Sequence, residues 1–331
     1  MFEEIMPNLY RIIIPLPNSP LKDLNSYIIK SADRNLIIDT GFNRDVCYEA
    51  MQKGLGALDI DLAKTDFMLT HMHSDHTGLV SRLFTDTSRV FISRIDSQVF
   101  NENIDWSAML DYALHNGFEL EELIKAAESH PGFKYRPKKI PEFTLLDDGD
   151  TIQIGGYDLK CVLTPGHTQG HLCLYEEEKQ LLFSGDHLLY DITPHIESWS
   201  YAINSLKNYI ESLDKVRNFP VKLVLPGHRN FFMDMTGRID ALKKHHETRA
   251  NEVLQVLEGK TMSAYDIAAG MTWDIDCESW NLFPVAQKWF AVGETIAHLL
   301  YLESEGQIKR LKGEKTDTYC SSQKAIDKNI P

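Results

Sequence analysis

A ten-residue stretch in the first quarter of the chain crowds three histidines and an aspartate into one short turn. It reads Leu69-Thr70-His71-Met72-His73-Ser74-Asp75-His76-Thr77-Gly78. Because side chains alternate along a strand, His71 and His73 leave on the same face if the geometry of the preceding apolar run, residues 67–69, persists. Asp75 and His76 follow as the chain turns. Such a turn at a strand end can supply two ligands to one metal ion and two to another, and a polar surface turn is the alternative.

Three later apolar runs each lead, through a turn that contains glycine, to one ligand-type side chain. These side chains are His167, Asp186 and His228. Glycine allows a tight turn that exposes the next side chain at the edge of a sheet. Five histidines and two aspartates are therefore expected to converge on one edge of a layered structure.

Strand-like and helix-like segments alternate through the first 235 residues. Strands are expected at 9–14, 26–29, 35–40, 67–69, 151–154, 157–163, 172–175, 180–183 and 221–225, with helices from about 45 and at about 202–216. The alternation predicts a layered α/β domain over residues 1–235. A helical, aromatic insertion at about 96–140 interrupts the order, and it is either ordinary core or a lid over the site.

The chain becomes mostly helical after residue 236. Helices are expected at 238–257, 264–269 and 286–305, followed by a small basic hairpin at 306–313. Three helices followed by such a hairpin form the pattern of a winged helix, which we expect over residues 236–315. Residues 316–331 are expected to be a frayed tail.

Composition limits the class of protein. The 331 residues suffice for two domains, and the net charge of −14 disfavours a polyanionic partner such as RNA without excluding a local basic patch. No apolar stretch approaches the roughly 20 residues of a membrane span, and acids stand where a signal peptide would be basic. Five dispersed cysteines suit a reducing compartment. We expect a cytoplasmic protein without a membrane partner, and the oligomeric state is left open.

The ligand-bearing segments resemble the motifs of the metallo-β-lactamase superfamily. The matching segments are His71-Met72-His73-Ser74-Asp75-His76, Thr164-Pro165-Gly166-His167-Thr168, Ser184-Gly185-Asp186 and Pro226-Gly227-His228. The resemblance covers about residues 5–235 and implies an αββα sandwich with a dinuclear metal site. It implies that one metal is bound by His71, His73 and His167, that the other is bound by Asp75, His76 and His228, and that Asp186 bridges them.

The same resemblance implies the chemistry. Imidazole and carboxylate ligands suit two divalent ions, Zn²⁺ in the first place and Fe or Mn as alternatives. A metal pair about 3.5–4 Å apart lowers the pKa of bound water, so hydroxide is the expected nucleophile. We assign catalytic roles to Asp75 and Asp186.

Other residues near these motifs are expected to support the site. Asp39 resembles the family's early strand-end acid, which orients a ligand imidazole, although a turn-forming aspartate is the alternative. His171 and His187 are expected to pack beside the metal ligands. His195 either faces the substrate or is an ordinary loop histidine.

Two classes of function stay open. An aspartate at position 186, where true β-lactamases typically have cysteine, argues against that activity. Residues 289–302 resemble the winged helix of lactamase-like hydrolases that include a single-strand endoribonuclease. The expected function is hydrolysis of a small ester, thioester or lactone by metal-bound hydroxide. The alternatives are a nuclease acting on single-stranded RNA, with Lys309, Arg310 and Lys312 as its basic cluster, and a mononuclear iron dioxygenase similar to persulfide dioxygenases.

Overall fold

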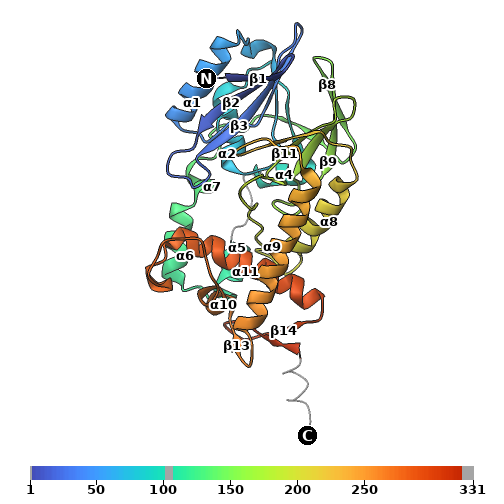
Figure 1. The fold of residues 1–331 in the computed structure, drawn as a ribbon. Coiled ribbons are helices and arrows are strands. Elements are labelled where there is room, and N and C mark those ends of the chain that lie inside the picture. The colour runs from blue at the N-terminus through green and yellow to red at the C-terminus, as the bar shows by residue number, and fades with distance from the viewer. Residues whose placement is uncertain (1, 101–106, 323–331) are drawn as a thin grey trace. The chain divides into compact units, whose positions relative to one another are not determined.

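The computed structural model describes residues 2–100 and 107–322, and the chain divides into two compact units (Figure 1). Unit 1 comprises Met1–Ile104, Pro131–Pro194 and Ser212–Ile239, and unit 2 comprises Asp105–His130, His195–Glu211 and Asp240–Pro331. Residues 105–130 of the expected insertion thus belong to unit 2. The domain boundary at residues 235 and 236 stays a prediction.

Unit 1 is built on two β-sheets (Figure 1). The first has the strand order β1-β2-β3-β4-β5-β6-β7, formed by Phe2–Met6, Leu9–Pro15, Asp23–Ile29, Asn35–Ile38, Thr65–Met68, Val90–Ser93 and Phe143–Leu146. The second has the order β12-β11-β10-β9-β8, formed by Leu223–Pro226, Leu181–Gly185, Leu172–Glu176, Tyr157–Leu163 and Thr151–Ile154. Strands β4 to β7 run parallel to one another, as do β11 and β12. The carboxyl ends of β5 and β6 therefore lie at the same sheet edge.

The helical segments that begin in unit 1 are mostly short. They are α1 (Asp45–Ala57), η1 (Leu62–Lys64), α2 (Ser74–Thr77), α3 (Val80–Leu83), α4 (Arg94–Ser97), η2 (Gln98–Phe100), α7 (Pro131–Lys134) and α9 (Met235–Val256). Helix α8 (Ser205–Arg217) enters unit 1 with its C-terminal half. Only α1 has the length of an ordinary globular helix within unit 1, so the two sheets carry most of its framework.

Two apolar cores hold unit 1 together. Between the sheets, Met68 and Tyr27 of the first sheet pack with Leu174 and Phe183 of the second. On the outer face of the first sheet, Met51 and other side chains of α1 and α3 pack against a second apolar cluster. Fully burying one such side chain contributes roughly 1.5–3 kcal/mol, so these two cores contribute strongly to the stability of the sandwich.

Helix α8 covers the outer face of the second sheet. Ser212 donates a hydrogen bond from its hydroxyl to the carbonyl of Pro165 at 2.8 Å, and the Lys215 ammonium donates to the carbonyl of Leu163 at 2.9 Å. With α1 on the opposite side, unit 1 has four layers in the order helix, sheet, sheet, helix. The αββα sandwich expected from the sequence is confirmed.

Three strands of the first sheet were not expected from the sequence: β1, β6 and β7. The four residues of β6 are all buried, so they show no alternation of apolar and polar side chains. β1 and β7 are short and largely exposed, and they carry few apolar residues that face a core. Their place in the sheet is set by pairing with a neighbouring strand rather than by a local pattern.

Unit 2 is mostly helical. It contains α5 (Ser107–His115), α6 (Leu120–Ser129), most of α9, α10 (Ala264–Gly270), η3 (Trp280–Leu282) and α11 (Val285–Ser304), with a small sheet of order β13-β15-β14 formed by Thr261–Met262, Thr318–Ser321 and Ile308–Leu311. The insertion contributes Tyr112 and Phe118 to the same buried core as Trp289 and Ile296. These aromatic side chains therefore act as core residues, as the simpler sequence interpretation proposed.

The C-terminal hairpin differs from the sequence expectation. The partner of β14 is β15, which lies beyond residue 313 in the stretch expected to be a tail. Tyr319 is fully buried, and its hydroxyl donates to the side-chain oxygen of Asn116 at 3.2 Å. The expectation of a tail is thus wrong for residues 318–321. Burial of Tyr319 holds β15 in place, and a strand of this length is too short to show an alternation of apolar and polar residues in the sequence.

Among the described residues, no helix combines the length and the apolar character needed to cross a membrane.

Candidate metal centre

The quoted histidine turn begins where strand β5 ends, at Met68. His73 precedes helix α2 with an extended backbone, and its carbonyl accepts hydrogen bonds from the backbone amides of His76 and Thr77, at 3.0 Å each. This one turn of helix carries Asp75 and His76. The switch from strand to helix over a few residues is what aims the four side chains at neighbouring points.

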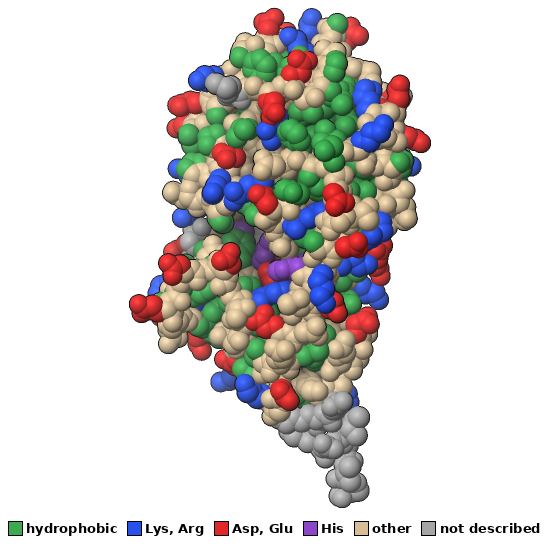
Figure 2. Space-filling model, viewed as in Figure 1, with side chains coloured by type: hydrophobic (Ala, Val, Ile, Leu, Met, Phe, Trp, Pro, Cys, Tyr) green, Lys and Arg blue, Asp and Glu red, His purple; other side chains and the backbone are tan. Residues whose placement is uncertain are grey.

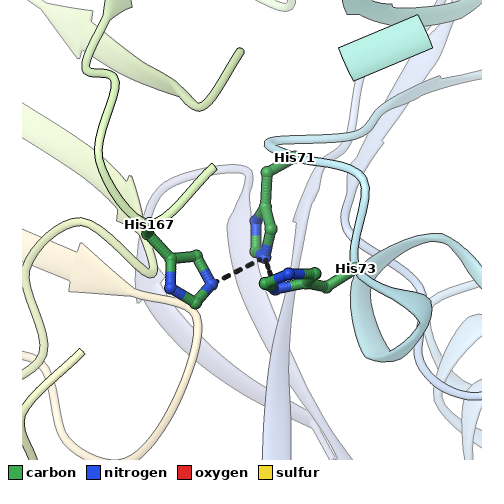
Figure 3. A group of neighbouring side chains, drawn as sticks. All are labelled: His71, His73 and His167. Carbon is green, nitrogen blue, oxygen red and sulfur yellow. Dashed lines mark hydrogen bonds between the residues drawn. The ribbon is translucent and has the colours of Figure 1, made fainter. Parts of the chain in front are cut away.

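Three of the predicted ligands form one group. Nε2 of His71 lies 3.1 Å from Nδ1 of His73 and 3.2 Å from Nε2 of His167 (Figure 3). Figure 3 shows the three rings converging from two separate chain segments. In a tetrahedral zinc site with Zn–N bonds of about 2.0–2.1 Å, ligand nitrogens are about 3.3 Å apart. The spacing of these nitrogens fits a metal ion among them.

The other predicted ligands form a second group beside the first. Nε2 of His228 lies 3.3 Å from Nε2 of His76 and 3.4 Å from Oδ2 of Asp75. Asp186 reaches both groups, because Oδ2 lies 3.4 Å from Nε2 of His228 and 3.6 Å from Nε2 of His167. All seven predicted ligands are thus brought together within unit 1. Three overlapping sets of residues could each hold an ion: His71, His73 and His167; His71, His76 and Asp186; and Asp75, His76 and His228.

Hydrogen bonds to the far side of two ligand rings decide which nitrogen faces the site. Asp39 accepts from the backbone amide of Thr70 at 2.9 Å, from the Thr70 hydroxyl at 2.8 Å and from Nδ1 of His76 at 2.8 Å. Because the Thr70 hydroxyl donates to Asp39, it accepts from Nδ1 of His71, 3.1 Å away. Both imidazoles therefore present Nε2 to the site, and Asp39 contacts the imidazole of one predicted ligand, His76.

His228 and His171 are oriented in the same manner. Nδ1 of His228 donates to the backbone carbonyl of Asp23 at 2.7 Å. His171 donates from Nδ1 to the Thr164 hydroxyl at 2.8 Å and accepts the backbone amide of Asp186 at Nε2, 3.1 Å away. His171 is therefore not a ligand in this arrangement. It fixes the backbone from which the Asp186 carboxylate projects.

Two glycines let the chain approach the site closely. A side chain at Gly227 would place its Cβ 2.6 Å from Oδ1 of Asp186. A side chain at Gly185, where φ is +47°, would place its Cβ 2.6 Å from Nε2 of His171. Both positions require glycine for space, and Gly185 also requires it for its left-handed backbone.

The charges of the cluster balance one another. Burial alone would lower the pKa of His76, but the carboxylates of Asp39 and Asp186 raise it well above its ordinary value. Burial and the neighbouring imidazoles instead lower the pKa of His71. Burial would raise the pKa of Asp186, but the imidazoles of His228 and His76 lower it well below its ordinary value. The lowered pKa of Asp186 favours its ionised form, whose charge a divalent cation would balance.

One buried atom supports the fit of a cation. Oδ1 of Asp186 is inaccessible to solvent and accepts no hydrogen bond from any described residue, although Nε2 of His76 lies 3.4 Å from it. A buried carboxylate oxygen without a donor is costly, and a metal ion would compensate it. The donor set of imidazoles and carboxylates, the nitrogen spacing and this oxygen all fit bound divalent ions.

Two other histidines have roles that the sequence left open. His187 is fully buried with its ring 6.1 Å from that of His171, and burial lowers its pKa to about 3, so it packs as a neutral side chain. His195 belongs to unit 2, where its Nε2 lies 3.3 Å from Glu197 and its Nδ1 lies 3.7 Å from Glu294. His195 is thus part of a charged group of unit 2 rather than one of the metal ligands.

His195 gives unit 2 a pH-dependent stability. Burial would lower its pKa, but Glu197 and Glu294 raise it from 6.5 to about 9. A raised pKa in the folded state stabilises the protein fully below pH 6.5, and this contribution is lost as the pH rises through 9. His195→Gln should therefore lower the free energy of unfolding by about 1–2 kcal/mol at pH 6, less than the shift alone implies because water screens the partly exposed ring.

Chemical denaturation at pH 6 and pH 10 checks this expectation. The difference between wild type and His195→Gln should shrink at the higher pH, while His115→Gln, at an exposed position of the same unit, should show little difference at either. An equal loss at both values would show that charge does not cause the effect.

Thr70 and Thr164 help to orient side chains of the site, a role that the sequence did not indicate. Each stands at a strand end directly before or near a ligand, but a threonine there is also an ordinary β-branched residue. Only the hydrogen bonds to Asp39 and His171 distinguish them.

Comparison with known proteins agrees with this geometry. Residues 22–228 match the Metallo-beta-lactamase superfamily, and residues 250–319 match the Metallo-beta-lactamase-like, C-terminal domain. The Probable metallo-hydrolase YqjP of Bacillus subtilis is 25% identical over 316 residues, which are 90% of this chain and 92% of that protein. The Atrochrysone carboxyl ACP thioesterase dmxR1 of Cryptosporiopsis sp. is 26% identical over 260 residues, 77% of this chain. The chain covers 65% of that fungal protein's length.

Solved structures extend the similarity to nearly the whole chain. A metallo-beta-lactamase family protein from Thermus thermophilus has 29% identity and a TM-score of 0.80, and the match covers 96% of this chain and 100% of that one. A Beta-lactamase domain protein from Burkholderia ambifaria has a TM-score of 0.82 at 24% identity, which shows a shared fold. Because the superfamily match runs from residue 22 to residue 228 and so takes in both ligand groups, the chain belongs to the metallo-beta-lactamase superfamily.

Proposed function

We propose that the protein is a dinuclear metal-dependent hydrolase whose substrate is a small ester, thioester or lactone. The observation that carries the proposal is that two ligand groups share one carboxylate, Asp186, within unit 1. A site of this kind needs no serine or cysteine nucleophile. When bound, two divalent ions would polarise the scissile carbonyl and make water a competent nucleophile at neutral pH.

Each protein ligand has a defined part in this proposal. His71, His73 and His167 would hold one ion, while Asp75, His76 and His228 would hold the other, and Asp186 would bridge them. The carboxylates of Asp75 and Asp186 are ionised: in both, burial alone would raise the pKa, but the neighbouring imidazoles lower it, to about 2 in Asp75 and well below the ordinary value in Asp186. Ionised oxygens accept hydrogen bonds, so these two side chains can also orient a water molecule. Zn²⁺ is the proposed metal, with Fe or Mn as alternatives.

The chemical class of substrate is supported by the relatives. The fungal relative is named a thioesterase and the bacterial one a metallo-hydrolase. A panel of esters, thioesters and lactones, hydrolysed by the metal-reconstituted chain, tests the proposal directly. Turnover of none of the three classes would reject it.

The C-terminal unit is proposed to be a winged helix. Helices α9, α10 and α11 are followed by the antiparallel pair β14 and β15, and β13 completes the small sheet. A winged helix can bind nucleic acid, but Arg310, the central residue of the hairpin's basic cluster, is turned inward. Arg310 stacks over the ring of Tyr201 at 3.5 Å, and its guanidinium lies 3.8 Å from the carboxylate of Asp317.

Charge on the surface also favours a small substrate. The chain carries a formal net charge of −14, and Figure 2 shows acidic and basic side chains interspersed over the visible face. A protein that neutralises several phosphates loses affinity steeply as salt rises, whereas binding of a small ester releases few counterions. A small-molecule substrate is therefore the better match to this surface.

A salt titration distinguishes a hydrolase of small esters from a nuclease that cleaves single-stranded RNA. Ester hydrolysis should change less than about twofold between 50 and 200 mM salt, because few charges are neutralised on binding. Lys309→Ala combined with Lys312→Ala, at two exposed positions flanking the inward-facing Arg310, should leave the rate nearly unchanged. Single-stranded RNA cleavage by the wild type that falls steeply with salt and is lost in the double variant would reverse the assignment.

A further inference from the structure

A buried aspartate outside the ligand set connects the two chain segments that carry the three-histidine group. Asp96 lies in α4, directly after β6, and its side chain is 3% exposed. Because β5 and β6 are parallel neighbours, Asp96 and the histidine turn leave the sheet at the same edge. The sequence around Asp96 has no ligand motif and did not indicate a role in the site.

The carboxylate of Asp96 accepts hydrogen bonds from both segments. Oδ2 accepts from the backbone amide of Met72 at 2.9 Å, and Met72 stands between His71 and His73. The same oxygen accepts from the hydroxyl of Thr168 at 2.7 Å, one residue after His167.

The other carboxylate oxygen of Asp96 makes a second hydrogen bond to the segment that carries His167. Oδ1 accepts from the backbone amide of Gly170 at 2.7 Å. A side chain at Gly170 would place its Cβ 2.5 Å from Oδ1 of Asp96 and 2.3 Å from Oγ of Ser93. Ser93 in turn accepts the backbone amide of Asp96 at 3.0 Å, which fixes the aspartate itself. The absence of a side chain at Gly170 is what allows this close contact.

We propose that Asp96 is a positioning residue for the metal site, and that it sets the separation of His167 from His71 and His73. The inference rests on the proposed metal-dependent function. Each of the three hydrogen bonds ends on a residue next to a ligand or close to one, and together they tie two segments nearly a hundred residues apart. Groups that orient ligands without touching the metal typically change metal affinity about 10- to 100-fold when removed.

Asp96→Asn tests this with little change in side-chain volume. The amide can accept with one oxygen only, so its NH₂ group must face either the Gly170 amide or the Met72 and Thr168 donors. One of the two bound ions should then dissociate about 10- to 100-fold more readily than in the wild type, while the other is held as before. The measurement is competition between the full-length, metal-depleted chain and a chromophoric chelator, with Zn²⁺ and then Co²⁺, whose visible spectrum reports the coordination.

A matched control removes a buried aspartate at the opposite end of the neighbouring strand. Asp66 is fully buried in β5, and its carboxylate accepts hydrogen bonds from the guanidinium groups of Arg34 and Arg89. Asp66→Asn should reduce stability but leave both metal affinities and the Co²⁺ spectrum unchanged. Equal weakening in the two variants would show a general loss of stability and would overturn the role of Asp96.

Two further variants keep the test decisive if Asp96→Asn folds poorly. Gly170→Ala pushes on Asp96 from the second segment and should weaken the same ion. Thr168→Val removes one donor and should give a smaller loss, which Thr168→Ser restores. Unaltered metal binding in all the variants, beside a wild type that binds two ions, rejects this inference alone. A wild type that binds no ion rejects the proposed function and this inference with it.

Discussion

Asp186→Ala should lower the rate of hydrolysis at least about 10³-fold. Asp186 reaches both ligand groups, so in the proposed dinuclear site its loss would remove a ligand from each ion. Lewis-acid stabilisation by such metal sites is worth several kcal/mol, and every 1.36 kcal/mol corresponds to a tenfold change in rate. Bound metal should fall in parallel with activity.

The fold should survive this substitution. The apolar cores of unit 1 do not include the carboxylate, and strand β11 beneath it stays packed through Leu181 and Phe183. Circular dichroism and elemental analysis of the same sample separate loss of metal from loss of structure. Asp191→Ala, at an exposed position five residues later, is the matched control and should behave like the wild type. Full metal loading with wild-type turnover in Asp186→Ala would disprove the bridging role.

Metal removal should have an equally large effect. The reconstituted chain should contain about two divalent ions, because seven ligand side chains divide into two groups around one shared carboxylate. Dialysis against a chelator should abolish hydrolysis, and addition of Zn²⁺, Fe or Mn should restore it. The ligand types allow all three metals, so the most active metal is an outcome of the experiment.

The number of metal ions bound per chain also decides between hydrolysis and the dioxygenase alternative. One iron per chain after full reconstitution, with oxygen consumption instead of hydrolysis, would favour the mononuclear dioxygenase alternative. Two ions with hydrolysis would support the proposal. Asp75→Asn offers an internal check, since it alters a ligand of the second group and should weaken one ion more than the other.

The local pattern of residues predicted part of the framework of unit 1. Alternating apolar strands, a glycine turn before each late ligand-type residue and the spacing from His71 to His76 predicted a layered α/β structure with seven ligand-type side chains at one edge, whereas the αββα sandwich came from the resemblance to the superfamily's motifs. These features depend on neighbours within a few residues. A strand end and the turn after it are short-range properties, and hence a single sequence contains them.

Other features arise from contacts between distant residues. Asp39 meets His76 across 37 positions, and Asp96 meets Gly170 across 74. The residues around Asp96 gave no sign of its contact, and the role of Asp39 was indicated only by the resemblance to the superfamily, because an aspartate after a strand also fits an ordinary turn. The same holds for β6, whose four buried residues show no period.

Unit 2 gives the clearest case of long-range determination. The insertion around Phe118 joins the core of Trp289, and β15 pairs with β13, which lies much earlier in the chain, as well as with β14. Burial of an aromatic side chain cannot be inferred from so short a segment, as the fully buried Tyr319 demonstrates. Local spacing thus indicated the candidate metal ligands. Only the folded chain determined which of their nitrogens face the site and which groups orient them, because hydrogen bonds and apolar burial act between segments that only folding brings together.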